Sequence, residues 1–111
     1  MHPEVAARLR SIVRSIHRTD LFIVGLDYPI YATVDHLHCA VERQVEIIGA
    51  NLSIASRLDP TLADAVPCLR DIVALRGRIS QADSLLDTHM IWMVTQRDLP
   101  ALRAQVLAVL R

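Results

Sequence analysis

The residues best suited to chemistry lie in the stretch LRGRISQADSLLD, at positions 75–87. Arg76 lies four residues after Ile72, so it interrupts the apolar face of an expected helix. An arginine on such a face needs a carboxylate partner or an interface, because an unpaired buried charge is costly. Asp71, Asp83 or an acid of a second copy would serve, and a guanidinium also fits phosphate. Structural pairing and phosphate binding therefore both stay open for Arg76.

Two polar residues, Gln81 and Asp83, follow in the same stretch. A glutamine amide neither gains nor loses a proton near neutral pH, but it can hydrogen-bond a phosphate or orient a water molecule. Asp83 would share a face with Arg76 if the helix continued, two turns apart, and a nearby arginine would weaken it as a base. His89 lies thirteen residues from Arg76 across an expected loop, so we interpret it as a partly buried histidine at a helix start.

The remaining histidines and cysteines do not predict a metal or redox site. His36 and His38 are two residues apart, and side chains at that spacing on a helix point in different directions, so we interpret both as solvated. Cys39 and Cys68 match no metal or redox spacing, which favours two packed thiols in a reduced chain. We expect no cofactor and no metal.

Composition and periodicity predict an all-α fold. Of the 111 residues 52% are apolar, only four are aromatic, and three Gly and five Pro are too few for a small all-β domain. We expect a first helix from Pro3 through Ile16, an irregular connection over 20–32, helices over 33–58, 60–66 and 68–81, and a fifth helix from near Asp87. Thr33 is the candidate N-cap of the helix over 33–58. Pro100 either kinks the fifth helix or starts a sixth segment capped by Asp98. The result is a compact antiparallel helical bundle of about five helices in a single domain, 1–111.

Charge and hydropathy exclude several classes of protein. Twelve arginines balance twelve acidic residues, with no lysine, so strong non-specific attraction to nucleic acid is not expected. The longest apolar run, LFIVGL at 21–26, is too short to span a bilayer, and the N-terminus carries charges among its apolar positions, unlike a secretory signal. We expect a soluble, cytoplasmic protein.

Three segments together resemble one family: AVERQVEIIGA at 40–50, PCLRDIVALR at 67–76 and IWMVTQRDLPALRAQV at 91–106. They are similar to the HepT-like branch of the HEPN superfamily, and the resemblance covers nearly the whole chain. It implies a HEPN-like bundle, a homodimer, and a metal-independent RNase that is the toxin of a toxin–antitoxin pair. It also implies a minimal nucleotidyltransferase partner that silences the toxin by attaching AMP to a tyrosine.

The motif of that family is Arg, four residues, His, one residue, Tyr. Arg76 matches the arginine, Gln81 stands where the histidine is expected, and Asp83 stands where the tyrosine is expected. The family's later tryptophan falls on Trp92 without a gap, which supports this alignment. Loss of positioned acid–base catalysis typically slows a reaction by ~10²–10⁴-fold. Catalytic positions Arg76, Gln81 and Asp83 are therefore expected to be impaired.

The missing tyrosine also removes the usual AMP acceptor. Tyr28 and Tyr31 lie in the early connection, and we interpret them as core or rim aromatics. We expect a HepT-like protein with RNase activity lost or reduced that binds a nucleotidyltransferase-type partner, with RNA as a further candidate ligand. The alternatives are an active RNase toxin that uses Arg76 with Gln81, Asp83 or a partner-chain group, and a nucleotide- or substrate-binding subunit. Surplus apolar helix surface predicts a homodimer.

Overall fold

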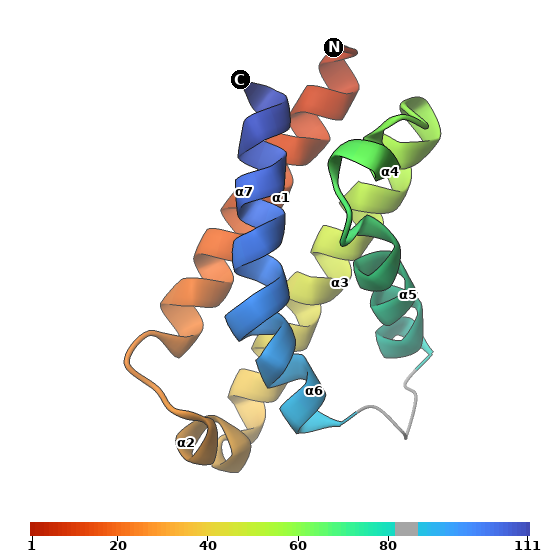
Figure 1. The fold of residues 1–111 in the computed structure, drawn as a ribbon. Coiled ribbons are helices and arrows are strands. Elements are labelled where there is room, and N and C mark those ends of the chain that lie inside the picture. The colour runs from red at the N-terminus through yellow and green to blue at the C-terminus, as the bar shows by residue number, and fades with distance from the viewer. Residues whose placement is uncertain (82–86) are drawn as a thin grey trace.

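The computed structural model describes residues 1–81 and 87–111, and these form a bundle of antiparallel helices (Figure 1). Four helices make up its body: α1 (Pro3–Ile23), α3 (Asp35–Leu58), α5 (Leu69–Ser80) and α7 (Leu99–Leu110). Three short helices, α2 (Tyr28–Thr33), α4 (Leu62–Ala65) and α6 (Thr88–Met93), lie at the turns, and a π-helical turn, η1 (Val94–Asp98), joins α6 to α7. No strand occurs among the described residues, so the predicted all-α fold is confirmed.

Helix α1 is longer than its sequence suggested. The side chain of His2 accepts a hydrogen bond from the amide of Glu4 at 3.0 Å, and Pro3 occupies the first turn as expected. The expectation of an irregular connection over 20–32 is wrong, because buried Thr19 and Ile23 continue the apolar stripe through another two turns. Only residues 24–27 are non-helical, where Gly25 has a positive φ of 77° that a glycine adopts without strain.

Helix α2 occupies the rest of the expected connection. The carboxylate of Asp27 accepts the amide of Ile30 at 3.0 Å, and Pro29 lies in the first turn, where a missing N–H costs nothing. Thr33 is not the N-cap of α3, because it ends α2 and its hydroxyl donates to the carbonyl of Ile30 at 2.9 Å. Val34 takes the cap position without a side-chain hydrogen bond, and α3 ends at Leu58 as predicted.

The later elements follow the expected punctuation with shifts of a few residues. Asp59 accepts the amide of Thr61 at 3.1 Å and delays α4, which covers 62–65 rather than 60–66. Helix α5 covers 69–80 instead of 68–81, with Gln81 as its C-cap residue. Asp87 caps α6 by accepting the amide of His89 at 2.6 Å, which confirms the predicted start of that helix.

A π-helical turn resolves the ambiguity at Pro100. A proline inside a continuous α-helix removes one hydrogen bond and clashes with the carbonyl four residues earlier. Here the amide of Leu99 bonds the carbonyl of Val94, and Pro100 falls in the first turn of α7. The backbone stays helical from α6 through η1 into α7, so the π-helical turn accommodates Pro100 without starting a separate segment. Asp98 makes no side-chain capping bond, so the alternative of a sixth segment capped by Asp98 is wrong.

The core lies between the four long helices and is lined mostly by aliphatic residues. Tyr31 is its largest fully buried side chain, with its ring centroid 5.0 Å from that of Trp92. Tyr28 is half-buried beside Trp92, and Met90 and Met93 pack against the same cluster. The core or rim positions expected for both tyrosines are confirmed. Across the described residues, no helix combines the length and apolar character that a bilayer crossing requires.

Candidate anion-binding site at the crossing of α3 and α5

Helices α3 and α5 meet closely where Gly49 faces Arg76. A Cβ atom at Gly49 would overlap the Cβ of Arg76, and it would lie 2.9 Å from the Arg76 Cγ and 3.2 Å from the carbonyl oxygen of Ile72. Only a residue without a side chain fits at this point. The buried Gly49 therefore lets the aliphatic stem of Arg76 lie directly on the backbone of α3.

Arg76 borders a small pocket with no acid among the described residues that line it. Its Nε atom is buried and has no hydrogen-bond partner, and the residue forms no ion pair within residues 1–81 and 87–111. Leaving such a donor unsatisfied costs about 1–3 kcal/mol. A small pocket of about 80 Å³ borders this group, lined by Arg76, Arg57, Ser53, Ala50 and Ile54. Two guanidinium groups and a hydroxyl-bearing residue therefore surround one small space.

Carboxylates expected as partners do not reach Arg76 in the described part of the chain. Asp71 is exposed and lines a different pocket. Glu46, one turn before Gly49 on α3, accepts from Arg43 at 2.8 Å and from the Ser80 hydroxyl at 3.4 Å. Intramolecular pairing with Asp71 is therefore not what holds Arg76.

Of the three motif positions, the structure describes Arg76 and Gln81, and it does not bring these two side chains together. Gln81 is exposed at the end of α5, where its amide bonds the carbonyl of Gly77 at 3.1 Å, and it does not line the pocket of Arg76. Helical side chains lean toward the N-terminus of their helix, which directs Arg76 toward Arg57 and away from Gln81. Asp83 lies outside the described residues, so its expected position on the face of Arg76 stays a prediction.

Arg57 and Ser53 were not predicted from the sequence as members of the site. A signal was present, because Gly49, Ser53 and Arg57 recur every four residues and so share one face of α3. Small residues at that spacing indicate a close helix crossing, with the arginine one turn beyond it. The pattern did not reveal which helix crosses there or that Arg76 would be opposite.

The other candidate side chains have structural partners or are exposed. His89 is at a helix start as predicted, but it is exposed rather than partly buried, and its ring packs edge-on against Tyr28 at a centroid distance of 5.0 Å. His38 is not solvated, because it packs on Tyr31 and its Nε2 lies 2.7 Å from the Tyr31 carbonyl oxygen; His36 is exposed. No group of three metal-ligating side chains forms within the described residues.

Three further side chains, those of Cys68, Cys39 and Tyr31, bear on reactivity. Cys68 is half-buried and donates to the side-chain oxygen of Gln105 at 3.3 Å, and burial raises the pKa of its thiol. Cys39 is exposed, so the expectation that both thiols are packed is wrong for this residue. Burial, with a smaller effect from the charge of Glu42, raises the pKa of Tyr31, whose enclosed hydroxyl is not accessible to a modifying enzyme.

Comparisons with known protein families, with characterised proteins and with solved structures find no match to this chain. What the site can do chemically is therefore inferred from its geometry. Two arginines that converge on a small pocket can bind an anion through charge-assisted hydrogen bonds. None of the described residues that line the pocket has a side chain that exchanges protons near neutral pH.

Proposed function

We propose that this chain is a HepT-like protein of the HEPN type that acts as a binding module and no longer cleaves RNA. The resemblance supplies the family, and the antiparallel helical bundle agrees with the fold that the resemblance implies. In this proposal Arg76 binds a phosphate of RNA, and the protein pairs with a minimal nucleotidyltransferase.

The proposed loss of RNase catalysis rests on one observation. Arg76 retains a buried, unpaired Nε beside Arg57, whereas Gln81 is exposed at the end of α5. RNA cleavage without a metal needs a base for the 2′-hydroxyl and an acid for the leaving oxygen, and histidine usually supplies them. An arginine pair without such a group favours phosphate binding over hydrolysis.

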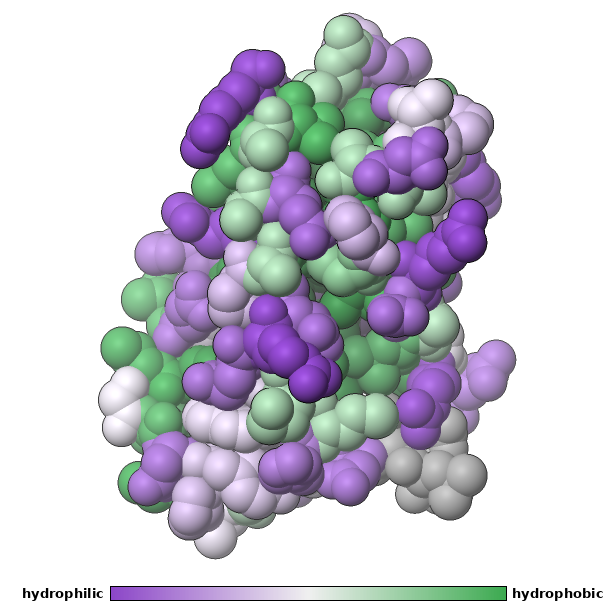
Figure 2. Space-filling view, in the orientation of Figure 1, coloured by the Kyte–Doolittle hydropathy of each residue, from purple (hydrophilic) through white to green (hydrophobic). Residues whose placement is uncertain are grey.

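The proposed homodimer and partner contact draw support from the surface. Leu21 is 60% exposed and Val24 is 74% exposed, with Phe22 and Ile30 also exposed nearby in the sequence. Figure 2 shows apolar residues over the lower end of α1 and its connection to α2. Clustered apolar side chains on a small protein are typical of an interaction surface. Light scattering should therefore give twice the chain mass at micromolar concentration, and a monomer would contradict this part of the proposal.

The RNA experiment uses the full chain with labelled single-stranded RNA in the presence of a chelator. We expect binding without cleavage, and Arg76→Met should weaken binding about tenfold, as expected for loss of one strong charge-assisted contact. Arg70→Met is the matched control, because Arg70 is exposed on the same helix and lines neither this pocket nor the other two described here. Cleavage that disappears in Arg76→Met would overturn the proposal in favour of an active RNase.

The partner experiment is separate. The product of a neighbouring nucleotidyltransferase gene would be co-expressed with this chain and the mixture analysed by size-exclusion chromatography. A stoichiometric complex is the expected result. Loss of that complex in Val24→Asp, with the homodimer intact, would assign the exposed apolar surface to the partner; separate elution of the two wild-type proteins would contradict the pairing.

A further inference from the structure

A second pocket lies between α1 and α7, on a different pair of helices from the Arg76 site. Its volume is about 470 Å³, and it is lined by Val13, Arg14, His17 and Arg18 from α1 and by Arg103 from α7. Figure 1 shows these two helices side by side and antiparallel. The four residues from α1 follow the spacing i, i+1, i+4, i+5, which places them on one face of the helix.

The cations of this pocket are not neutralised. None of Arg14, Arg18 and Arg103 forms an ion pair in the part of the chain that the structure describes, and Arg14 has only a hydrogen bond to the Ser11 hydroxyl at 2.9 Å. No acidic side chain is among the described residues that line the pocket. Three like charges that share one space repel each other, and an anion would relieve that repulsion.

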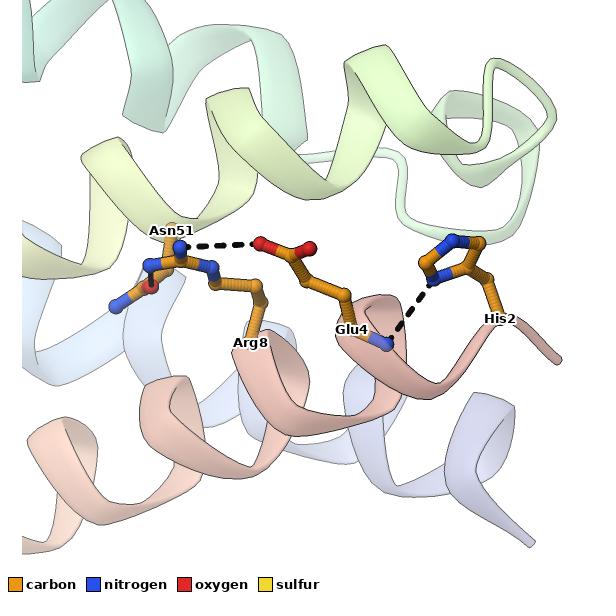
Figure 3. Close-up of polar contacts among 4 residues, drawn as sticks. All are labelled: His2, Glu4, Arg8 and Asn51. Atoms are coloured by element: carbon orange, nitrogen blue, oxygen red, sulfur yellow. Dashed lines mark hydrogen bonds and ion pairs between the residues drawn. The ribbon is translucent and has the colours of Figure 1, made fainter.

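Arg8, on the same helix, shows what a structurally paired arginine is like in this protein. Its Nη2 lies 3.2 Å from Glu4 Oε1, and its Nη1 donates to Asn51 Oδ1 at 3.2 Å (Figure 3). Figure 3 shows the guanidinium of Arg8 directed toward both partners, one on α1 and one on α3. Within the described residues, Arg8 thus has an acidic partner, whereas the arginines around the second pocket have none.

The arrangement indicates the size and charge of a ligand. Three arginines around one space complement a ligand that carries several negative charges. Two or three linked phosphates supply these charges, and each guanidinium binds phosphate oxygens through paired N–H donors. The pocket volume falls in the ~300–1,000 Å³ range of small-molecule sites. The basic group of this pocket is confined to three arginines, whereas long nucleic acids favour an extended basic surface, so a small polyanion fits this pocket better.

We propose that the pocket formed by Arg14, His17, Arg18 and Arg103 binds a diphosphate or triphosphate group. This site does not depend on the proposed function and does not include Arg76. His17 adds a ring N–H donor, and half-buried Val13 forms an apolar wall. The phosphate chain belongs either to a free inorganic polyphosphate or to the tail of a nucleotide.

The test is isothermal titration of the full chain with pyrophosphate, tripolyphosphate, AMP and ATP. Pyrophosphate and tripolyphosphate should bind, AMP should bind at least about tenfold more weakly, and Arg14→Gln, Arg18→Gln and Arg103→Gln should each lower affinity at least about fivefold. These side chains are exposed, so the variants should fold, and their unfolding midpoints would verify it. Equal affinity for ATP and tripolyphosphate means that only the phosphate chain is recognised, and tighter ATP binding means a nucleotide; both results uphold the site.

Two controls keep this proposal separate from non-specific attraction and from the Arg76 site. Arg10→Gln removes the same charge from an exposed position of α1 outside the pocket, and Arg76→Met alters the other site. Neither should change pyrophosphate affinity. The proposal is overturned if pyrophosphate and tripolyphosphate do not bind at millimolar concentration, or if Arg10→Gln reduces affinity as much as Arg18→Gln. RNA binding that needs Arg14 and Arg18, without any binding of free triphosphate, would also overturn it.

Discussion

The two arginine pockets of this protein are built in opposite ways. Between α3 and α5, the stem of Arg76 is pressed against Gly49, and a buried Nε borders a space of about 80 Å³. Between α1 and α7, three exposed arginines surround a space of about 470 Å³. Both lack a carboxylate among the described lining residues. They differ in how much water reaches the charges.

That difference decides which property each arginine controls. Water screens charges at an exposed site, so removing one there changes ligand affinity but little stability. Partly buried polar groups interact more strongly with a bound anion and cost more when unpaired. The Arg76 pocket is therefore coupled to the packing of the bundle, whereas the α1–α7 pocket is a feature of its surface.

The largest expected effect comes from Gly49→Ala. The added Cβ overlaps Arg76 and approaches the backbone carbonyl of Ile72, so α5 must shift away from α3, at a cost of about 1–3 kcal/mol in the free energy of unfolding. Gly77→Ala is the matched control, because nothing lies within 4 Å of its added Cβ, and it should stabilise the chain by about 0.5–1 kcal/mol. Urea unfolding measures both, and equal stability of the two variants would show that the helices are not in close contact.

The next effect is on ligand affinity. Raising the salt concentration from 0.1 to 1 M should weaken pyrophosphate binding at the α1–α7 pocket about tenfold, since salt screens the contacts of its three exposed arginines. The factor by which Arg76→Met weakens RNA binding should change less, because a partly buried contact is less screened. Titrations at the two salt concentrations compare the sites, and equal salt dependence would remove the distinction between them.

A smaller effect is expected for the stability of Arg76 variants. Arg76→Met keeps an unbranched apolar stem on Gly49 and removes the unsatisfied Nε, so its unfolding free energy should stay within about 1 kcal/mol of the original chain. Arg76→Ala loses the stem as well and should be the less stable of the two. If chemical denaturation gives Arg76→Ala a higher unfolding free energy than Arg76→Met, the contact of the stem with Gly49 is not stabilising.

The smallest effect concerns the exposed arginines. Arg18→Gln and Arg103→Gln should change the unfolding free energy by less than about 0.5 kcal/mol, because neither side chain has a partner in the described structure. Arg8→Gln loses its contacts with Glu4 and Asn51 and should cost about 0.5–1 kcal/mol more. Thermal unfolding of the three variants tests this order, and a larger loss of stability in Arg18→Gln than in Arg8→Gln would contradict it.

Much of the fold could be predicted because periodic apolar residues specify a helix locally. The stripe from Val41 to Ala55 indicated α3 and its end near Leu58, and Asp87 indicated the start of α6. Helix α2 was missed because Pro29 is read as a helix breaker, although it is tolerated in a first turn. The π-helical turn before Pro100 was not predicted, because the sequence does not show how the chain relieves the clash between the proline ring and the preceding turn.

The candidate sites were predictable only in part. Arg76 stands out in the sequence because it interrupts an apolar face, and that position needs no tertiary information. Its neighbours Arg57 and Ser53 come from another helix, and the sequence does not state where two helices cross. Of the partners left open for Arg76, Asp71 does not pair with it, because the crossing directs the guanidinium toward α3; pairing with Asp83 or with an acid of a second copy stays a prediction.

The helical class, the apolar stripes of α1, α3 and α5 and the balance of twelve arginines against twelve acids could be predicted from the sequence alone. These follow from residue type and from spacing along one chain segment. Only the tertiary structure decided which arginines share a space: Arg76 with Arg57, and Arg14 and Arg18 with Arg103. The physical reason is that helix packing, through close contacts such as that of Gly49 with Arg76, brings together residues that are distant in the sequence. The residues on the neighbouring helix then decide whether an arginine is paired with an acid or can bind an anion.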